Sequence, residues 1–105
     1  MNRGDVWWAE LPSPAGRRPV VLISRNDAYR IRNQVVVAEV TTRIRSISAE
    51  VRLDESDGMP KTCVANFDAV HTLEKKRILS YITSLTPGRL IEMDHAIHFA
   101  LGLDD

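Results

Sequence analysis

The stretch from residue 19 to residue 41 reads PVVLISRNDAYRIRNQVVVAEVT and contains two runs of β-branched and aliphatic residues. The runs Pro19–Ser24 and Gln34–Thr41 are too short for buried helices, and their side chains suit a pleated sheet, so both are predicted as strands. The polar segment between them, Arg25–Asn33, is interpreted as a surface loop. Because consecutive antiparallel strands usually pair, the stretch predicts a hairpin in which the first strand begins beside the end of the second.

Segments outside this hairpin also show strand patterns, separated by turn-forming residues. The predicted strands are Val6–Leu11, Ala49–Leu53, Thr62–Phe67 and Ile78–Leu85. Turns are expected at Pro12–Gly16 and Asp57–Pro60, which are rich in proline, glycine and other turn formers. The segment Leu73–Arg77 is interpreted as a short turn of helix.

The C-terminal segment carries the signals of a longer helix. Thr86 suits the capping position, Pro87 suits the first helical position, and Gly102 marks the end. Apolar residues recur at helical spacing between them: Leu90, Met93, Ile97 and Leu101. The fold class is therefore predicted as mainly β (α+β), a small twisted antiparallel sheet or partly closed barrel with one C-terminal helix packed against it.

Length and composition restrict the class of protein. With 105 residues, 44% of them apolar and 27% charged, the chain is predicted to form one globular domain over residues 1–105. No apolar run exceeds four residues, the length of Val20–Ile23 and Val35–Ala38, which is too few to span a membrane. No apolar secretion signal follows the first residues, so the expected compartment is the cytoplasm. Cys63 is the only cysteine, which excludes an internal disulfide and a cysteine-based metal cage.

The charges are divided unevenly along a chain whose formal net charge is zero. Residues 1–52 contain nine arginines and five acidic residues, whereas residues 53–105 contain five basic and nine acidic residues. The N-terminal cations are all arginines, whose planar guanidinium groups bind phosphate in a bidentate manner and stack on bases. This half therefore suits RNA or a phosphorylated ligand, and the alternative is a solvated surface of ion pairs.

The predicted hairpin also places a candidate site. Arg17 and Arg18 immediately precede its first strand, and Thr41, Thr42 and Arg43 end its second, so Arg18 and Thr41 should be neighbours. A guanidinium and a hydroxyl that converge at a sheet edge can hold a phosphodiester through charge and hydrogen bonding. The alternative is an arginine that covers a strand end and a threonine that satisfies a turn.

The histidines and tryptophans offer weaker candidates. His95 and His98 are spaced to share one helical face, but no further ligand is evident, so no metal site is predicted. His71 could belong to a ribonuclease that uses two histidines, although nothing in the sequence brings it near the helix. Trp7 and Trp8 are adjacent in a strand and should face opposite ways.

Five blocks of the sequence, taken in their order and spacing, resemble a known family. The blocks are 3-RGDVWW-8, 16-GRRPVVLIS-24, 36-VVAEVTTRI-44, 67-FDAVHTLEKKRI-78 and 100-ALGL-103. Over nearly the whole chain they are similar to the MazF/PemK-type toxins, the endoribonucleases of toxin–antitoxin pairs. The chain departs from the family in its short first loop, Pro12–Gly16, and in having His71 where an arginine is common.

The resemblance implies a small SH3-like barrel of the MazF/PemK/CcdB type and a homodimer. It further implies cleavage of single-stranded RNA without metal or cofactor, by attack of the 2′-hydroxyl, to leave 2′,3′-cyclic phosphate and 5′-hydroxyl ends. Arg18 and Thr41 match the family's catalytic pair. Residues expected to contact RNA are Arg17, Ser24, Arg25, Asn26, Thr42, Arg43 and His71.

The resemblance also implies an antitoxin as partner. We expect its acidic, flexible tail to lie along the arginine-rich groove and block RNA. The alternatives are a non-catalytic toxin of the same fold, such as a gyrase poison, or an RNA-binding module. The tail Leu101–Asp105 lacks the aromatic residue of the gyrase-poison branch and disfavours that reading.

Overall fold

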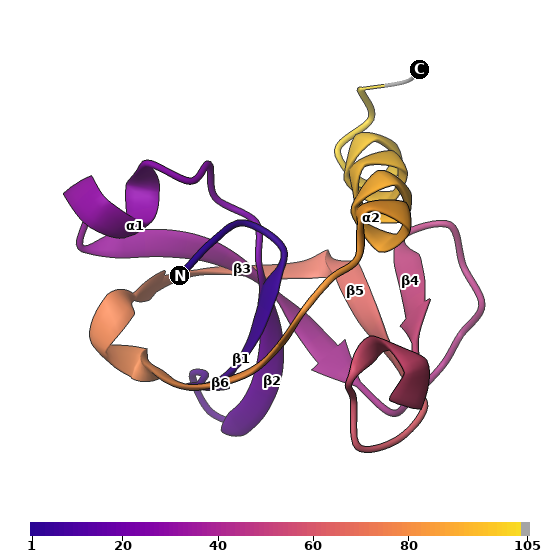
Figure 1. Cartoon of the computed structure of the whole chain (residues 1–105), viewed down its shortest axis with the longest axis horizontal. Coiled ribbons are helices and arrows are strands. Elements are labelled where there is room, and N and C mark those ends of the chain that lie inside the picture. Colours follow the sequence, from indigo (N-terminus) through magenta and orange to yellow (C-terminus); the bar gives the residue numbers. More distant parts are fainter. Residues whose placement is uncertain (104–105) are drawn as a thin grey trace.

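A computed structural model describes residues 1–103, and Asp104 and Asp105 of the tail considered above lie outside the described residues. It contains an antiparallel sheet of six strands in the order β4-β5-β3-β2-β1-β6 (Figure 1). The strands are β1 (Asp5–Glu10), β2 (Arg17–Leu22), β3 (Gln34–Thr41), β4 (Glu50–Leu53), β5 (Cys63–Glu74) and β6 (Ile78–Ser84). The predicted class, a mainly β protein with an antiparallel sheet and a C-terminal helix, is confirmed.

The hairpin of β2 and β3 forms as predicted, with Val20 opposite Glu39 and Leu22 opposite Val37. Continued toward the start of β2, this register brings Arg18 level with Thr41. The connection was predicted to be a loop throughout, and that was wrong at α1 (Ala28–Ile31), a single helical turn. Ala28 is buried in a core cluster, so packing orders a segment whose polar composition indicates a loop.

Strand β5 continues seven residues past Phe67, where the predicted strand ends. The 3-10 turn η2 (Lys75–Arg77) follows it and coincides with the second part of the helical turn predicted at Leu73–Arg77. Its register against β3 shifts, because Ala38 pairs with Val70 whereas the next residue, Glu39, pairs with Asn66. Residues 67–69 are thus extra on the β5 side and form a bulge. The bulge interrupts the alternation of buried and exposed residues, which is why the sequence pattern hides the rest of the strand.

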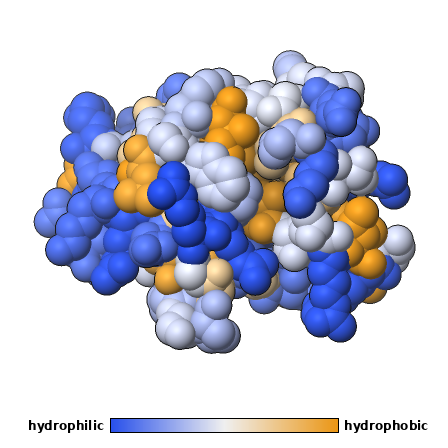
Figure 2. Space-filling view, turned by 90° about the horizontal axis from the view of Figure 1, so that it is seen from below, coloured by the Kyte–Doolittle hydropathy of each residue, from blue (hydrophilic) through white to orange (hydrophobic). Residues whose placement is uncertain are grey.

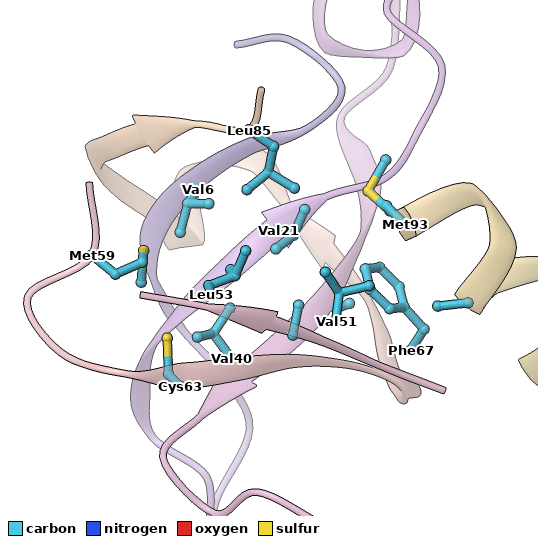
Figure 3. Packing of buried hydrophobic residues seen from close by; sticks show 13 residues of the cluster. Val6, Val21, Val40, Val51, Leu53, Met59, Cys63, Phe67, Leu85 and Met93 are labelled. Atoms are coloured by element: carbon cyan, nitrogen blue, oxygen red, sulfur yellow. The ribbon is translucent and has the colours of Figure 1, made fainter. Parts of the chain in front are cut away.

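Helix α2 (Pro87–Ala100) begins as predicted, with the Thr86 side chain accepting a hydrogen bond from the Arg89 amide at 3.3 Å. It inserts the buried side chains of Met93 and Ala96 into the main core. Figure 3 shows Met93 pointing from the helix toward this cluster. Leu101 was expected to continue the apolar stripe, but it follows the end of the helix and is 63% exposed. In Figure 1, α2 lies beside β4 and β5.

The sheet is buried on both faces by two clusters of apolar side chains. Val21 belongs to the main cluster with α2, whereas Val20 and Leu22 belong to a second cluster on the opposite face. On the molecular face seen in Figure 2, apolar side chains reach the surface as separate patches among hydrophilic ones. Within residues 1–103, no helix has both the length and the apolar character needed to cross a bilayer.

Candidate active site

A hollow of about 300 Å³ opens where the start of β2 meets the end of β3. Its lining comes from four parts of the chain: Arg18 of β2, Glu39 and Thr41 of β3, Arg43 and Arg45 of the following loop, and Asn66 and Ala69 of β5. The hairpin prediction that Arg18 and Thr41 lie together is therefore correct. Three arginines and one glutamate give the hollow a positive balance that suits an anionic ligand.

Arg18 is held so that part of its guanidinium stays available. Its Nε donates to the Ala15 carbonyl at 3.2 Å and lies 3.9 Å from Oε1 of Glu39. Within the described residues, the two terminal nitrogens make no hydrogen bond, and the side chain is 37% exposed. The paired donors of the guanidinium fork can therefore bind two oxygens of a phosphate.

Thr41 presents a hydroxyl that already accepts one hydrogen bond. Its Oγ1 accepts a hydrogen bond from the Arg43 amide at 3.2 Å. The hydroxyl hydrogen is then free to be donated to a ligand, since a hydroxyl donates once and accepts twice. Arg18 and Thr41 together offer three directed donors to an anion in the hollow.

A second hollow, of about 520 Å³, adjoins the first and shares Arg18 and Glu39 with it. The short loop Pro12–Ala15 forms its rim, and His71 of β5 completes the lining. His71 Nε2 lies 2.6 Å from Oε2 of Glu39, and the two side chains are 27% and 19% exposed. Because the two hollows have Arg18 and Glu39 in common, we refer to them together as the groove, whose lining includes residues of β2, β3 and β5.

A smaller apolar hollow of about 110 Å³ lies on the other side of Thr41 and includes Thr42, Trp8 and Cys63 in its lining. Arg17 stacks over the Trp8 ring, with Cζ 5.7 Å from the ring centroid. Cys63 is buried, and burial raises the pKa of its thiol above the ordinary value. The environment of this thiol is thus that of a packing residue and not of a nucleophile.

Three residues expected to contact RNA lie elsewhere. Ser24, Arg25 and Asn26 follow the far end of β2, and they line none of the hollows described above. The Ser24 hydroxyl accepts from the Val36 amide at 2.8 Å, and Asn26 Oδ1 accepts from the Arg3 amide at 2.7 Å. Both side chains therefore support the local backbone, whereas Arg25 is exposed.

The structure adds four lining residues that the sequence reading missed: Glu39, Arg45, Asn66 and Ala69. Glu39 could have been found, because it lies two residues before Thr41 on the same strand and so on the same face. Asn66 and Ala69 reach the hollow only because of the β5 bulge. Asn66 supports that bulge, since its Oδ1 accepts from the Asp68 amide at 2.9 Å.

Metal ligands are not gathered in this groove. In the part of the chain that the structure describes, no three histidine, cysteine, aspartate or glutamate side chains lie close enough together to hold a metal ion. His95 and His98 lie on α2, away from the residues that line the groove.

Comparisons with known proteins agree with the site and the fold. A family model described as the PemK-like, MazF-like toxin of type II toxin-antitoxin systems matches residues 2–101. The chain is 38% identical over 104 residues to the probable endoribonuclease MazF2 of Mycobacterium tuberculosis, covering 97% of this chain and 99% of that relative. It is also 32% identical to the endoribonuclease MazF of Staphylococcus epidermidis, covering 100% of this chain and 94% of the relative. Among solved structures, an endoribonuclease in complex with its cognate antitoxin from a mycobacterial species is similar with a TM-score of 0.86 and 30% identity, covering 98% of this chain and 96% of that one.

Proposed function

The chain belongs to the PemK-like, MazF-like toxins of type II toxin–antitoxin systems, and we propose that it is an endoribonuclease that cleaves single-stranded RNA in the groove around Arg18 and Thr41. The observation that carries this proposal is the shared hollow, in which both side chains have donors that no described residue occupies. Relatives named as endoribonucleases match almost the full length of the chain, which supports the same reaction here.

In the proposed reaction the RNA supplies its own nucleophile. The 2′-hydroxyl attacks the adjacent phosphorus, the bond to the 5′-oxygen breaks, and the products are a 2′,3′-cyclic phosphate and a 5′-hydroxyl. Arg18 stabilises the negative charge that develops on the phosphoryl oxygens, and Thr41 donates a hydrogen bond that orients the phosphate. The guanidinium groups supply positive charge at the phosphate, so the reaction is proposed to need no metal ion. DNA should be inert because it lacks the 2′-hydroxyl.

Residues around the hollow are proposed to bind the flanking nucleotides. Arg43 lies in the same hollow as the proposed catalytic pair, Thr42 lines the apolar hollow beside it, and Arg17 covers the Trp8 ring of that lining. A base can stack on the outer face of the Arg17 guanidinium that lies over the Trp8 ring, which gives the two side chains a role in holding a base. Ser24, Arg25 and Asn26 would be reached only by RNA that extends along β2 to its far end.

We further propose that the protein is a cytoplasmic homodimer held inactive by an antitoxin. The edge strand β6 carries the exposed apolar side chains of Leu79 and Tyr81, which a second copy would cover. A relative has been solved in complex with its cognate antitoxin, which supports an antitoxin as partner here. Because an acidic tail would use the same arginines as RNA, neutralising Arg17 and Arg18 should weaken the binding of both.

The test is incubation of the purified protein with mixed single-stranded RNA in EDTA, with mapping of 5′-ends and detection of cyclic phosphate. Arg18→Ala and Thr41→Ala are the test variants, and Arg32→Ala, an exposed arginine outside the groove, is the matched control. We expect discrete cuts that are lost in both test variants and retained in the control. Binding without cut ends would instead indicate an RNA-binding module, and equal cutting by all variants would move the active site elsewhere.

A further inference from the structure

The Glu39 carboxylate connects two side chains from different strands. Its Oε2 lies 2.6 Å from Nε2 of His71 on β5, and its Oε1 lies 3.9 Å from Nε of Arg18 on β2. All three side chains line the second hollow. One carboxylate oxygen thus contacts the imidazole at hydrogen-bond distance, and the other forms a longer ion pair with the proposed catalytic guanidinium.

The contact with Glu39 determines which nitrogen of His71 carries hydrogen. An ionised carboxylate only accepts hydrogen bonds, so Nε2 is the donor and the neutral ring has its lone pair on Nδ1. Among residues 1–103, Glu39 is the hydrogen-bond partner of His71, and Nδ1 has none. A histidine oriented by a carboxylate through one nitrogen, with the other nitrogen free in a groove, has the arrangement of a general base.

The proposed reaction needs such a base, and neither Arg18 nor Thr41 supplies one. Arg18 is protonated at all ordinary pH values, so it can stabilise charge but cannot readily accept a proton. Thr41 has an available hydrogen to donate and no tendency to accept a proton near neutral pH. Of the histidines in the described part of the chain, His71 alone lines the groove.

We propose that His71 is the general base of the RNA cleavage reaction and that Glu39 is the residue that positions it, an inference that rests on the proposed function. Nδ1 of His71 takes the proton of the 2′-hydroxyl while the 2′-oxygen bonds to phosphorus and the bond from phosphorus to the 5′-oxygen breaks. The departing 5′-oxygen takes a proton from water, and the imidazolium later returns its proton to solvent. Glu39 stabilises the imidazolium in between, as a buried carboxylate does in hydrolytic triads.

The surroundings of His71 limit what else controls its charge. Glu39 faces it from β3, and Arg18 lies next to Glu39 on β2. The loop Pro12–Ala15, which forms the rest of the hollow, contains no charged residue. The active form is the neutral imidazole, because an imidazolium has no lone pair with which to accept the proton of the 2′-hydroxyl.

The first test is single-turnover cleavage of an RNA that contains one cut site. His71→Ala should lose about 10²- to 10⁴-fold in rate, the contribution usual for a general base. Added free imidazole should restore part of the rate in this variant, which would not happen if His71 only supported the fold. His95→Ala, an exposed histidine on α2, is the matched control and should keep both the rate and its pH dependence. Should His71→Ala fail to fold, His71→Gln retains a side-chain donor for Glu39 and takes its place.

The second variant tests the positioning role of Glu39. In Glu39→Gln the amide can donate to Nε2 and so favour the tautomer with hydrogen on Nδ1, which cannot accept the proton. We expect a rate loss on the order of 10²-fold and a shift of the acidic limb of the pH–rate profile. Binding of a 2′-deoxy substrate should fall far less than the cleavage rate in His71→Ala and should not weaken in Glu39→Gln, since both variants keep the arginines and Glu39→Gln removes a negative charge from the groove.

A substrate with sulfur in place of the 5′-oxygen at the cut site shows whether His71 acts as the general base or as the general acid. Its leaving group needs no proton, so the His71→Ala defect should persist on it. If the defect disappears, His71 protonates the leaving group and the assignment as base is overturned. If His71→Ala and Glu39→Gln cleave ordinary RNA at the full rate while Arg18→Ala does not, the inference fails and the proposed function stands. If the unaltered protein cuts no RNA, both are overturned.

Discussion

Arg89 of α2 and Asp57 of η1 (Glu55–Asp57) form a bidentate ion pair that links the helix to the turn before β5. Nε and Nη2 of Arg89 donate to the two carboxylate oxygens of Asp57 at 3.0 and 3.2 Å. The Asp57 side chain is 5% exposed and the Arg89 side chain 23% exposed. The hydrogen bond with Asp57 raises the pKa of Arg89 above its ordinary value. The pair is thus a largely buried contact that we expect to stabilise the fold.

The change Arg89→Ala should lower the free energy of unfolding by about 2–3 kcal/mol. Removing one partner of a buried pair usually costs about 3–5 kcal/mol, because the other charge stays buried and unpaired. The lower figure applies here because water can enter the space left by the partly exposed Arg89. Asp57 also keeps one hydrogen bond, from the Asp54 amide to Oδ2 at 3.0 Å. In a domain of this size the loss corresponds to a decrease in Tm of roughly 10–20 °C.

The assay is urea unfolding at pH 7, followed by tryptophan fluorescence. The matched control is Glu92→Gln, which removes only the exposed partner of Arg89, at 3.1 Å, and should cost less than about 0.5 kcal/mol. Equal stabilities for Arg89→Ala and Glu92→Gln would refute the reasoning, since the buried carboxylate would then gain nothing from Arg89. The slope m should not change in either variant, because the surface exposed on unfolding is the same.

Three further predictions concern single side chains. Burial raises the pKa of Tyr29 to about 12, and the unfolded tyrosine ionises first, so stability should fall as the pH rises from about 10 to 12. Urea unfolding across this range should show a smaller fall in Tyr29→Phe. Leu53 is 0% exposed in the main core, so Leu53→Ala should lose about 3–4 kcal/mol in the same assay, whereas Ile91→Ala at an exposed position of α2 should lose less than about 1 kcal/mol. Cys63 is 3% exposed, and burial raises the pKa of its thiol. A disulfide reagent should therefore label this thiol only as fast as the protein unfolds. Rapid labelling without urea would contradict the burial of Cys63.

The hairpin and the C-terminal helix were predictable because their signals are local. Two β-branched runs joined by a short polar segment specify an antiparallel pair, and the register of that pair alone brings Arg18 and Thr41 together. Thr86 and Pro87 mark the start of α2 through interactions within the helix's first turn. In both cases, partners close in sequence decide the structure.

Structure that depends on distant partners was not predictable in this way. The one-turn helix α1 forms where Ala28 is buried, although its segment has the composition of a loop. Ser24, Arg25 and Asn26 follow the same strand as Arg18 but lie at its other end, so their position in a matching sequence block did not place them in the groove.

By itself the sequence determined the strand hairpin, the capped helix, the family and the fact that Arg18 and Thr41 lie together. Only the tertiary structure decided the link from Arg18 through Glu39 to His71. Glu39 and His71 are 32 residues apart and meet because β5 is the neighbour of β3, with a bulge at residues 67–69 that resets the register between them. Periodicity within one strand carries no information on which strand lies beside it or where a bulge falls, because both are chosen by the packing of the whole sheet.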